Sequence, residues 1–284
     1  MAPKLKAFDT ANATPNIFDR GQNDDDATWQ TLRREVKAIS LDLWGTILDD
    51  RHPPSDTVIY SEQRQNFLRD VLRDLGYEFS PEQMRAAYHQ AWRYFDALWE
   101  QQIAFGAEEG VREMLRFLNA ELPPDYFQRV KKFFEETPID ATSQAPPAFD
   151  GALDAIHALA KTYPLALISD TAWTPGRVLR QIFAYYDILD CFRVLLFSDE
   201  IGVTKPHPKI FHLALKALGV TPAACLHVGD LQRTDIAGAK ALGMRAAWIS
   251  RPVYAGHEQK DHGPDVVVSG VAEVAKKLLS GCSF

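Results

Sequence analysis

Hydrophobic and polar positions follow two different periods along this chain. From residue 55 to about residue 140, apolar residues recur at three- and four-residue intervals, the spacing of one helix face. The first such helix, TVIYSEQRQNFLRDVLRDLG, stops at Gly76, and Ser80-Pro81 supplies a cap residue and a first-turn proline for the next. Two more helices are predicted in GAEEGVREMLRFLNAEL and PDYFQRVKKFFEE. This segment therefore predicts four helices and no strand.

Short apolar runs alternate with helical segments in the rest of the chain. One run, at residues 36–42, precedes the four helices, and five follow them: PLALISD, CFRVLLFSDE, CLHVGD, MRAAWIS and DVVVSG. The helical segments among and after them are GALDAIHALAKTY, PGRVLRQIFAYYDI, PKIFHLALKALG, DIAGAKALG and VAEVAKKLLSG. Such alternation is typical of an α/β fold with a mainly parallel sheet covered on both faces. We expect a core of residues 36–54 and 145–284 and a helical insertion of residues 55–144.

The first 35 residues are expected to stand apart from this core as an N-terminal extension. They are rich in Asn, Asp, Gly and Pro and include the run Asp24-Asp25-Asp26. Asp26 is a suitable cap for a short helix over residues 27–34. No role for the extension follows from its sequence.

Composition narrows the range of partners. The 284 residues carry a formal net charge of -7, which disfavours nucleic acid or an anionic membrane as the main partner but permits an anionic small molecule. The three cysteines, Cys191, Cys225 and Cys282, are too far apart to suggest a disulfide framework or a zinc site. No signal-like apolar segment opens the chain, and no run approaches the roughly 20 apolar residues of a membrane span. We expect a cytoplasmic protein, monomeric or homodimeric.

Polar residues gather at the predicted strand ends, where open α/β sheets bind ligands. Asp42 and Asp230, at two separate ends, are suited to converge on a hard cation such as Mg²⁺. Ser169 and Lys205 offer donors to an anion. Together they suit the transfer of an anionic group to a carboxylate nucleophile. The other polar residues at or near these ends are Thr46, Asp170, Ser198, Asp199 and Asp235.

Four segments carry a resemblance to a known family. LDLWGT, LISDT, GVTKPHPKIF and HVGDLQRTD occur in the order of the four motifs of the haloacid dehalogenase-like hydrolase superfamily, which the chain resembles from about residue 36 onward. The resemblance implies a Rossmann-like core with a mobile helical cap inserted between motifs one and two. It also implies that Asp42 is a nucleophile forming a covalent aspartyl intermediate, with Ser169 and Lys205 as the other catalytic residues. The residues then assigned to substrate binding are Thr46, Trp44 and Asp170.

The same resemblance implies a magnesium site. Its ligands would be Asp42, Asp230 and the backbone carbonyl of Trp44. Asp235 would lie behind them and hold the metal's waters or Lys205. Gly45 is expected where the chain turns sharply beside the ligand.

Trp44 departs from the pattern of the superfamily's phosphatases. They have a second Asp at this position, which protonates the leaving alcohol and contributes about 10²–10⁴ in rate. Tryptophan has no proton for this role, and the superfamily's 2-haloacid dehalogenases commonly have an aromatic residue here because halide leaves unprotonated. The dehalogenases, however, work without metal and carry a Ser-Ser-Asn-type fourth motif, where this chain has Asp230 and Gln232.

Three interpretations therefore stay open. The first is a magnesium-dependent phosphatase of a small phosphorylated metabolite, which we favour because Asp230 beside Asp42 would be costly without a cation. The second is a dehalogenase-like C–X hydrolase, and the third is a non-catalytic scaffold that binds a phosphorylated ligand. His207 is a candidate for the missing proton donor, although a histidine in a loop is more often surface.

An aromatic stripe marks the second helix of the insertion. Its members fall on one face and either pack against neighbouring helices or form a lid over the substrate: Tyr88, Trp92, Phe95 and Trp99. Trp173 either borders the pocket or packs. Arg93 lies off the stripe and is either a solvated charge or an anion contact, and Arg177 is interpreted as an exposed helix residue rather than an anion contact.

Overall fold

The computed structural model describes residues 26–49, 54–139, 145–250 and 260–280. At its centre is a six-stranded parallel sheet in the order β3-β2-β1-β4-β5-β6. The strands are β1 (Ala38–Leu41), β2 (Leu165–Ser169), β3 (Phe192–Phe197), β4 (Cys225–Gly229), β5 (Arg245–Ile249) and β6 (Val266–Val268). All six lie within the apolar runs of the sequence, so the prediction of an α/β fold is confirmed.

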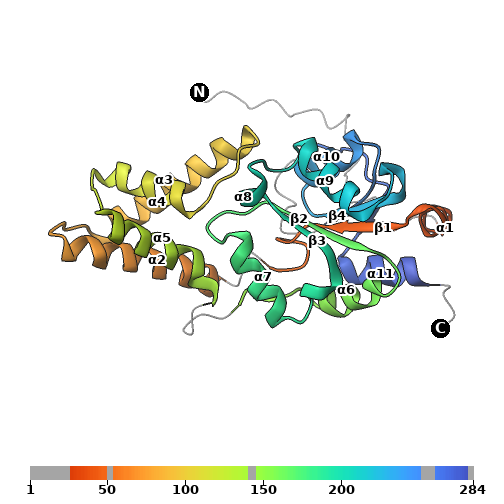
Figure 1. The fold of residues 1–284 in the computed structure, drawn as a ribbon, viewed down its shortest axis with the longest axis horizontal. Helices are drawn as coiled ribbons and strands as arrows, with labels where there is room; N and C mark the ends of the chain where they lie inside the picture. The colour runs from red at the N-terminus through yellow and green to blue at the C-terminus, as the bar shows by residue number, and fades with distance from the viewer. Residues whose placement is uncertain (1–25, 50–53, 140–144, 251–259, 281–284) are drawn as a thin grey trace, which may run out of the picture.

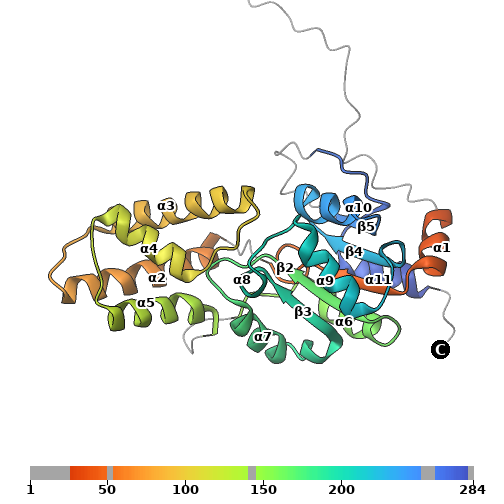
Figure 2. The same ribbon diagram turned by 45° about the horizontal axis from the view of Figure 1, so that its top comes forward.

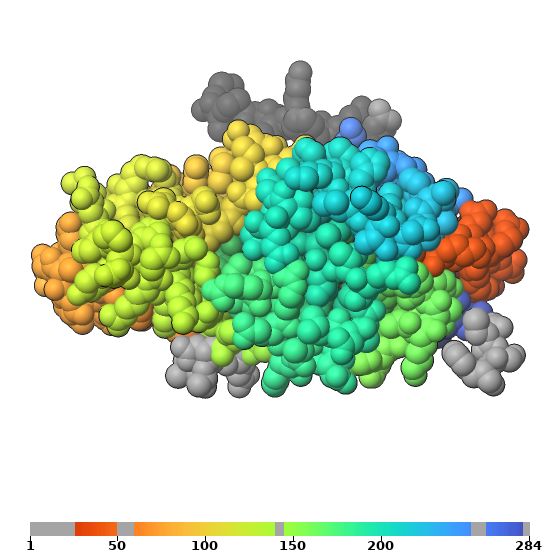
Figure 3. All heavy atoms as spheres, in the orientation of Figure 1, coloured from red at the N-terminus to blue at the C-terminus, as the bar shows by residue number. Residues whose placement is uncertain are grey.

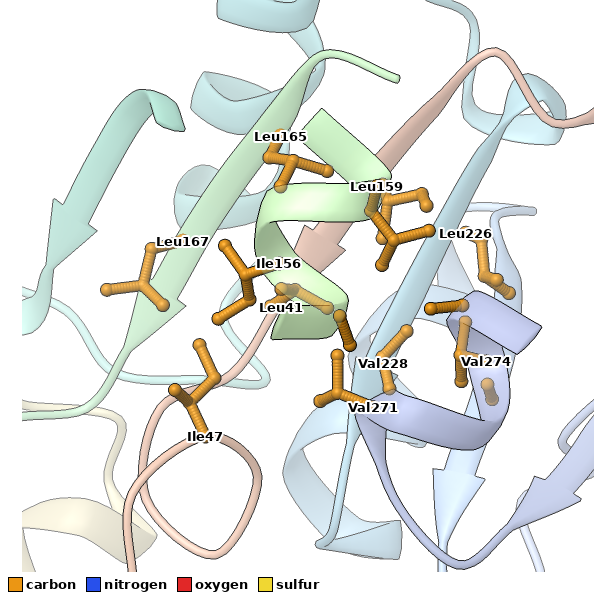
Figure 4. Close-up of a cluster of buried hydrophobic side chains, with 14 of the residues drawn as sticks. Leu41, Ile47, Ile156, Leu159, Leu165, Leu167, Leu226, Val228, Val271 and Val274 are labelled. Carbon is orange, nitrogen blue, oxygen red and sulfur yellow. The ribbon is translucent and has the colours of Figure 1, made fainter. Parts of the chain in front are cut away.

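Helices cover both faces of the sheet, as Figures 1 and 2 show. One face carries α1 (Asp26–Glu35), α6 (Ala152–Ala160), α7 (Gly176–Tyr185) and α11 (Val271–Leu279). The other carries α9 (Pro208–Leu218) and α10 (Ala237–Ala241), the latter preceded by a π-helical turn over Gln232–Ile236. In Figure 4, Leu41, Leu167 and Val228 of the strands face Ile156 of α6 and Val271 of α11. Burying a side chain of this size contributes about 1.5–3 kcal/mol, so this layer holds the sheet in place.

Four helices follow β1 and build a second hydrophobic cluster at one end of the molecule (Figure 3). They are α2 (Pro54–Asp74), α3 (Pro81–Glu100), α4 (Ala107–Leu118) and α5 (Pro124–Glu136), and we call residues 54–139 the insertion. The predicted cap of α3 is confirmed. The Ser80 hydroxyl accepts from the amide of Gln83, and the Gln83 side chain accepts from the amide of Ser80.

The N-terminal boundary needs correction. Residues 26–35 form α1, whose Trp29 and Leu32 are buried in the core cluster with α11, so this helix belongs to the core and not to an extension of residues 1–35. Asp26 lies in the first turn of the helix, inside the segment that it was expected to cap. Residues 1–25 lie outside the described residues.

The end of the third strand also differs from expectation. Residues 198–200 were predicted as strand, but Ser198–Ile201 form the short helix α8. The strand stops because the register pairs Phe197 with Ser169, the last residue of β2, and β2 offers no partner beyond it.

Two further features belong to the described residues. None of their helices is both long and apolar enough to cross a membrane. Their two cysteines have free thiols: Cys225 is buried and Cys191 half-buried. Cys282 lies outside the described residues.

Candidate active site

Three adjacent strands end at one edge of the sheet and deliver polar side chains there. Leu41 of β1 is in register with Leu167 of β2 and with Val228 of β4. Asp42, directly after β1, donates its amide to the carbonyl of Val228 at 2.9 Å. Ser169 closes β2, and Asp230 follows β4 by one residue. The sheet order changes direction at β1, and such a switch point is where open α/β sheets bind ligands.

Asp42 and Lys205 form a buried ion pair at this edge. The Lys205 Nζ lies 2.5 Å from Asp42 Oδ1 and 2.7 Å from Asp235 Oδ1, so one ammonium group bridges two carboxylates. The Thr46 hydroxyl donates to Asp42 Oδ2 at 3.1 Å. All four side chains are buried. Both oxygens of Asp42 thus accept from donors, which fix the orientation of its carboxylate.

Charge at this edge is only partly balanced. Burial raises the pKa of Asp42 well above its usual range, and Asp235 and Asp230 add to that effect while Lys205 opposes it. Burial by itself would lower the pKa of Lys205, but Asp235 and Asp42 outweigh it and hold the pKa above its ordinary value. Burial would likewise raise the pKa of Asp235, yet Lys205 and His227 lower it to about 2. Lys205 and Asp235 are therefore charged at neutral pH, and a cation beside Asp42 would favour its charged form.

Asp230 lies against the turn that follows the first motif. Gly45 has a φ of +72°, and a Cβ there would lie 2.1 Å from Asp230 Oδ2, so no larger residue fits. The expected sharp turn at Gly45 is confirmed. Carboxylate oxygens of Asp42, Asp230 and Asp235 lie within 4.8 Å of one another, an arrangement that suits a hard divalent cation. Asp235 already accepts from Lys205, His227 and the Leu231 amide, and these three donors leave its carboxylate less available to a cation.

Two residues of the site, Ser40 and His227, were not predicted from the sequence. The His227 ring lies 3.1 Å from Asp235 Oδ1 through Nε2 and 2.9 Å from the Ser40 hydroxyl through Nδ1. Burial lowers the pKa of His227, so the neutral ring donates from Nε2 and accepts at Nδ1. The signal was present in the sequence, since Ser40 and His227 are polar residues inside apolar strand runs and they pair across β1 and β4.

Asp170, which we expected to bind substrate, has two protein partners. Its Oδ1 accepts from the Lys205 amide at 2.9 Å, and its Oδ2 accepts from the indole Nε1 of Trp99 at 2.9 Å. The neighbouring Ser169 is buried at the end of β2, and its hydroxyl donates to the Asp170 carbonyl at 3.3 Å.

The side chains of Trp44 and of His207, the candidate proton donor, both have contacts within the protein. Trp44 is half-buried in the loop after β1 and packs against the core cluster. The Nδ1 of His207 accepts from the Lys209 amide at 3.2 Å, so this side chain caps α9. An indole offers no acidic proton, and the Nδ1 of His207 is engaged at the start of α9.

Most of the aromatic stripe packs inside the insertion. Tyr88 stacks on Trp173, with ring centroids 5.0 Å apart, and Trp92 meets Phe95 edge to face at 5.2 Å. Trp173, from the loop after β2, is itself buried in the insertion's cluster. Trp99 differs from the others because it reaches Asp170. Packing therefore accounts for most of the stripe, and only its last member lies at the site.

The remaining polar candidates stabilise local structure. Arg93 donates to Gln90 on its own helix, and Arg177 pairs with Glu135 and Glu136 of α5. Ser198 and Asp199 hold the loop after β2: the Ser198 hydroxyl accepts from the Thr171 amide, and the Asp199 carboxylate accepts from the amide of Gly176 in the first turn of α7.

Comparison with known proteins agrees with this arrangement. The family model described as a haloacid dehalogenase-like hydrolase matches residues 36–243. Phosphoserine phosphatase from Thermus thermophilus is 39% identical over 83 residues, which is 29% of this chain and 32% of that protein. Phosphoglycolate phosphatase from Pectobacterium atrosepticum is 27% identical over 173 residues, 61% of this chain and 72% of that protein. The matches with this phosphoserine phosphatase and with the glyceraldehyde 3-phosphate phosphatases of Pyrococcus furiosus and Pyrococcus abyssi span only about a third of the length of those proteins.

Solved structures share the fold. A 2-haloacid dehalogenase from Pseudomonas syringae aligns with a TM-score of 0.63 and 23% identity over 86% of this chain and 99% of that one. A HAD phosphatase from Thermococcus onnurineus aligns with a TM-score of 0.59 and 22% identity over 86% of this chain and 98% of that one. Phosphatases and dehalogenases thus occur among the structural neighbours, and the choice between them depends on the site.

Proposed function

Because the chain belongs to the haloacid dehalogenase-like hydrolases, we propose that it is a magnesium-dependent phosphatase of a small phosphorylated metabolite. The observation that carries the proposal is the balance of charge at the site. Lys205 bridges Asp42 and Asp235, and carboxylate oxygens of Asp42, Asp230 and Asp235 lie within 4.8 Å of one another, so a divalent cation beside them would offset their negative charge. The phosphatases among the relatives support the same class of reaction.

In the proposed reaction, a carboxylate oxygen of Asp42 attacks the phosphorus atom. The bond between phosphorus and the leaving oxygen breaks, and its electron pair stays on that oxygen. Water then attacks the phosphorus of the aspartyl phosphate, which releases inorganic phosphate and restores Asp42. Thr46 holds Asp42 in place, and Lys205 neutralises charge on Asp42 and on the transferred group. Ser169 would donate its hydroxyl to the same group.

Magnesium would be held by Asp42, Asp230 and the carbonyl of Trp44, with Asp235 orienting Lys205 behind them. The donor set fits, since it consists of oxygens and Asp230 lies directly against Gly45, next to the Trp44 peptide. When bound, the ion supplies the positive charge that the developing phosphoryl oxygens require. The insertion would act as a cap that keeps water from this edge of the sheet.

A C–X hydrolase is the second candidate, and Trp44 is the observation that favours it. An indole cannot protonate a leaving alcohol, whereas halide leaves without a proton. This candidate gives no role to Asp230, whose carboxylate lies within 4.8 Å of those of Asp42 and Asp235.

The first test compares two substrates with and without metal. We expect the purified protein to hydrolyse an aryl phosphate slowly with magnesium and to lose that activity in excess chelator. Release of chloride from 2-chloropropionate that chelator leaves unchanged would overturn the phosphatase proposal. Absence of both reactions, together with a phosphorylated ligand whose binding does not change in Asp42→Asn, would instead favour the non-catalytic scaffold.

The second test restores the missing acid. We expect Trp44→Asp to raise kcat for a phosphate ester with a poor alkoxide leaving group by about 10²–10⁴, the contribution of general acid catalysis. Trp44→Phe is the matched control, since it removes the indole without adding an acid and should leave kcat low. Equal rates in the two variants would show that proton transfer does not limit this enzyme.

A further inference from the structure

The C-terminal end of α3 touches the loops that carry the proposed catalytic residues. The indole Nε1 of Trp99 donates to Asp170 Oδ2 at 2.9 Å, and the other oxygen of that carboxylate accepts from the Lys205 backbone amide at 2.9 Å. The Lys205 ammonium in turn reaches Asp42 at 2.5 Å. Hydrogen bonds at the two ends of Lys205, its backbone amide and its ammonium group, therefore link the insertion to Asp42.

Two further contacts join the end of α3 to the loop that carries Lys205. The Thr204 amide donates to the Gln102 carbonyl at 3.2 Å, and Ile103 forms an antiparallel bridge with Val203. These contacts fasten the residues just after α3 to the residues just before Lys205.

Arg233 completes the arrangement from a third loop. Its guanidinium carbon lies 3.8 Å from the centre of the Trp99 ring, within the range of a cation–π contact. Arg233 belongs to the turn between Asp230 and Asp235. Trp99 is thus held by residues from the loops of the second and fourth motifs, and Asp170 connects it to the third.

We propose that Asp170 is a positioning residue for Lys205 and that Trp99 is the residue through which α3 holds Asp170. A carboxylate has two oxygens, and here each accepts one N–H group, so the same side chain fixes the Lys205 backbone and the end of the helix. When both contacts are made, the ammonium group is directed at Asp42. When the end of α3 withdraws, Asp170 loses one donor, and the Lys205 backbone is held less tightly. This inference rests on the proposed function, in which Lys205 acts on the nucleophile.

The kinetic test uses Trp99→Phe, which keeps an aromatic ring for Arg233 but removes the N–H donor. We expect kcat for an aryl phosphate to fall by about tenfold or more, the effect of losing a hydrogen bond to a charged group. KM should change little, because Trp99 acts through Lys205 and not on the substrate. Trp92→Phe, a substitution in the packed part of the same stripe, is the matched control and should leave kcat unchanged. Equal losses in the two variants would show that the stripe acts only by packing.

A double-mutant cycle separates the hydrogen bond from packing. Asp170→Asn leaves an acceptor for the Lys205 amide but turns an NH₂ group toward Trp99. In that background, adding Trp99→Phe should lower kcat by less than about twofold, because the contact is already lost. Effects that multiply fully in the double variant would contradict the proposed pathway.

Hydrogen exchange tests the inference without turnover. The Lys205 amide donates to Asp170, so its exchange in the full-length protein should accelerate by about tenfold in Trp99→Phe and stay unchanged in Trp92→Phe. Unchanged exchange in Trp99→Phe would overturn the inference even if the enzyme is a phosphatase. If the protein hydrolyses neither substrate but the Lys205 amide exchanges faster in Trp99→Phe, the link from Trp99 to Lys205 is upheld and the proposed function is wrong.

Discussion

Replacing Asp42 with asparagine is expected to lower kcat for an aryl phosphate by on the order of 10⁴-fold or more, as removal of a covalent nucleophile does in other enzymes. Asparagine keeps the shape of the side chain and an acceptor for Lys205 or Thr46, but it lacks the anionic oxygen that attacks phosphorus. Lys205 keeps Asp235 as its partner in this variant, and one of three clustered carboxylates is removed, so the fold should not weaken by much. Steady-state kinetics with magnesium present, together with thermal unfolding, measures both effects.

Asp150→Asn is the matched control for that experiment. Asp150 is exposed in the segment before α6, so the same chemical change should leave kcat unaltered. If Asp42→Asn kept more than about a tenth of the wild-type kcat while remaining folded, the covalent mechanism would be excluded.

Among the substitutions proposed for this protein, Lys205→Met is expected to cause the largest decrease in the free energy of unfolding. Lys205 is buried and bridges Asp42 and Asp235, and removing one member of a buried ion pair costs about 3–5 kcal/mol because the remaining charge has no partner. For a protein of this size that loss lowers Tm by about 6–20 °C. Turnover should disappear as well, since charge on the nucleophile and the phosphoryl group is no longer neutralised.

Two comparisons make this result specific. Lys209→Met changes an exposed lysine four residues further on and should alter stability by less than about 0.5 kcal/mol. Adding Asp235→Asn to Lys205→Met should recover part of the lost stability, because it removes a buried carboxylate that has lost its cation. A Lys205→Met protein as stable as wild type would show that the ion pair contributes nothing to the fold.

The sheet was predictable because its strands are short apolar runs separated by helical periods. The strand ends were predictable for the same reason, and parallel strands bring their carboxyl ends to one edge. Asp42, Ser169 and Asp230 could therefore be placed together before the structure was known. Their roles stay predictions: Asp42 as the nucleophile, Ser169 as a hydrogen-bond donor to the phosphoryl group, and Asp230 as a metal ligand.

The features that could not be predicted from the sequence depend on packing between residues far apart in the chain. Trp29 and Leu32 lie in a polar segment, and nothing local indicates that their helix docks against α11. The contact between Trp99 and Asp170 joins residues 71 positions apart in two different parts of the fold, so it depends on how the insertion sits on the core. Helical spacing could show which face of α3 is aromatic, but not which of those side chains reaches the site.

Trapping the intermediate tests the central claim most directly. The protein is mixed with an aryl phosphate and magnesium, quenched in acid during turnover and digested for mass spectrometry. We predict one phosphoryl group on the peptide that contains Asp42 in the wild type and none on that peptide in Asp42→Asn. Turnover without a phosphoryl group on Asp42, or with one on another residue, would contradict the account.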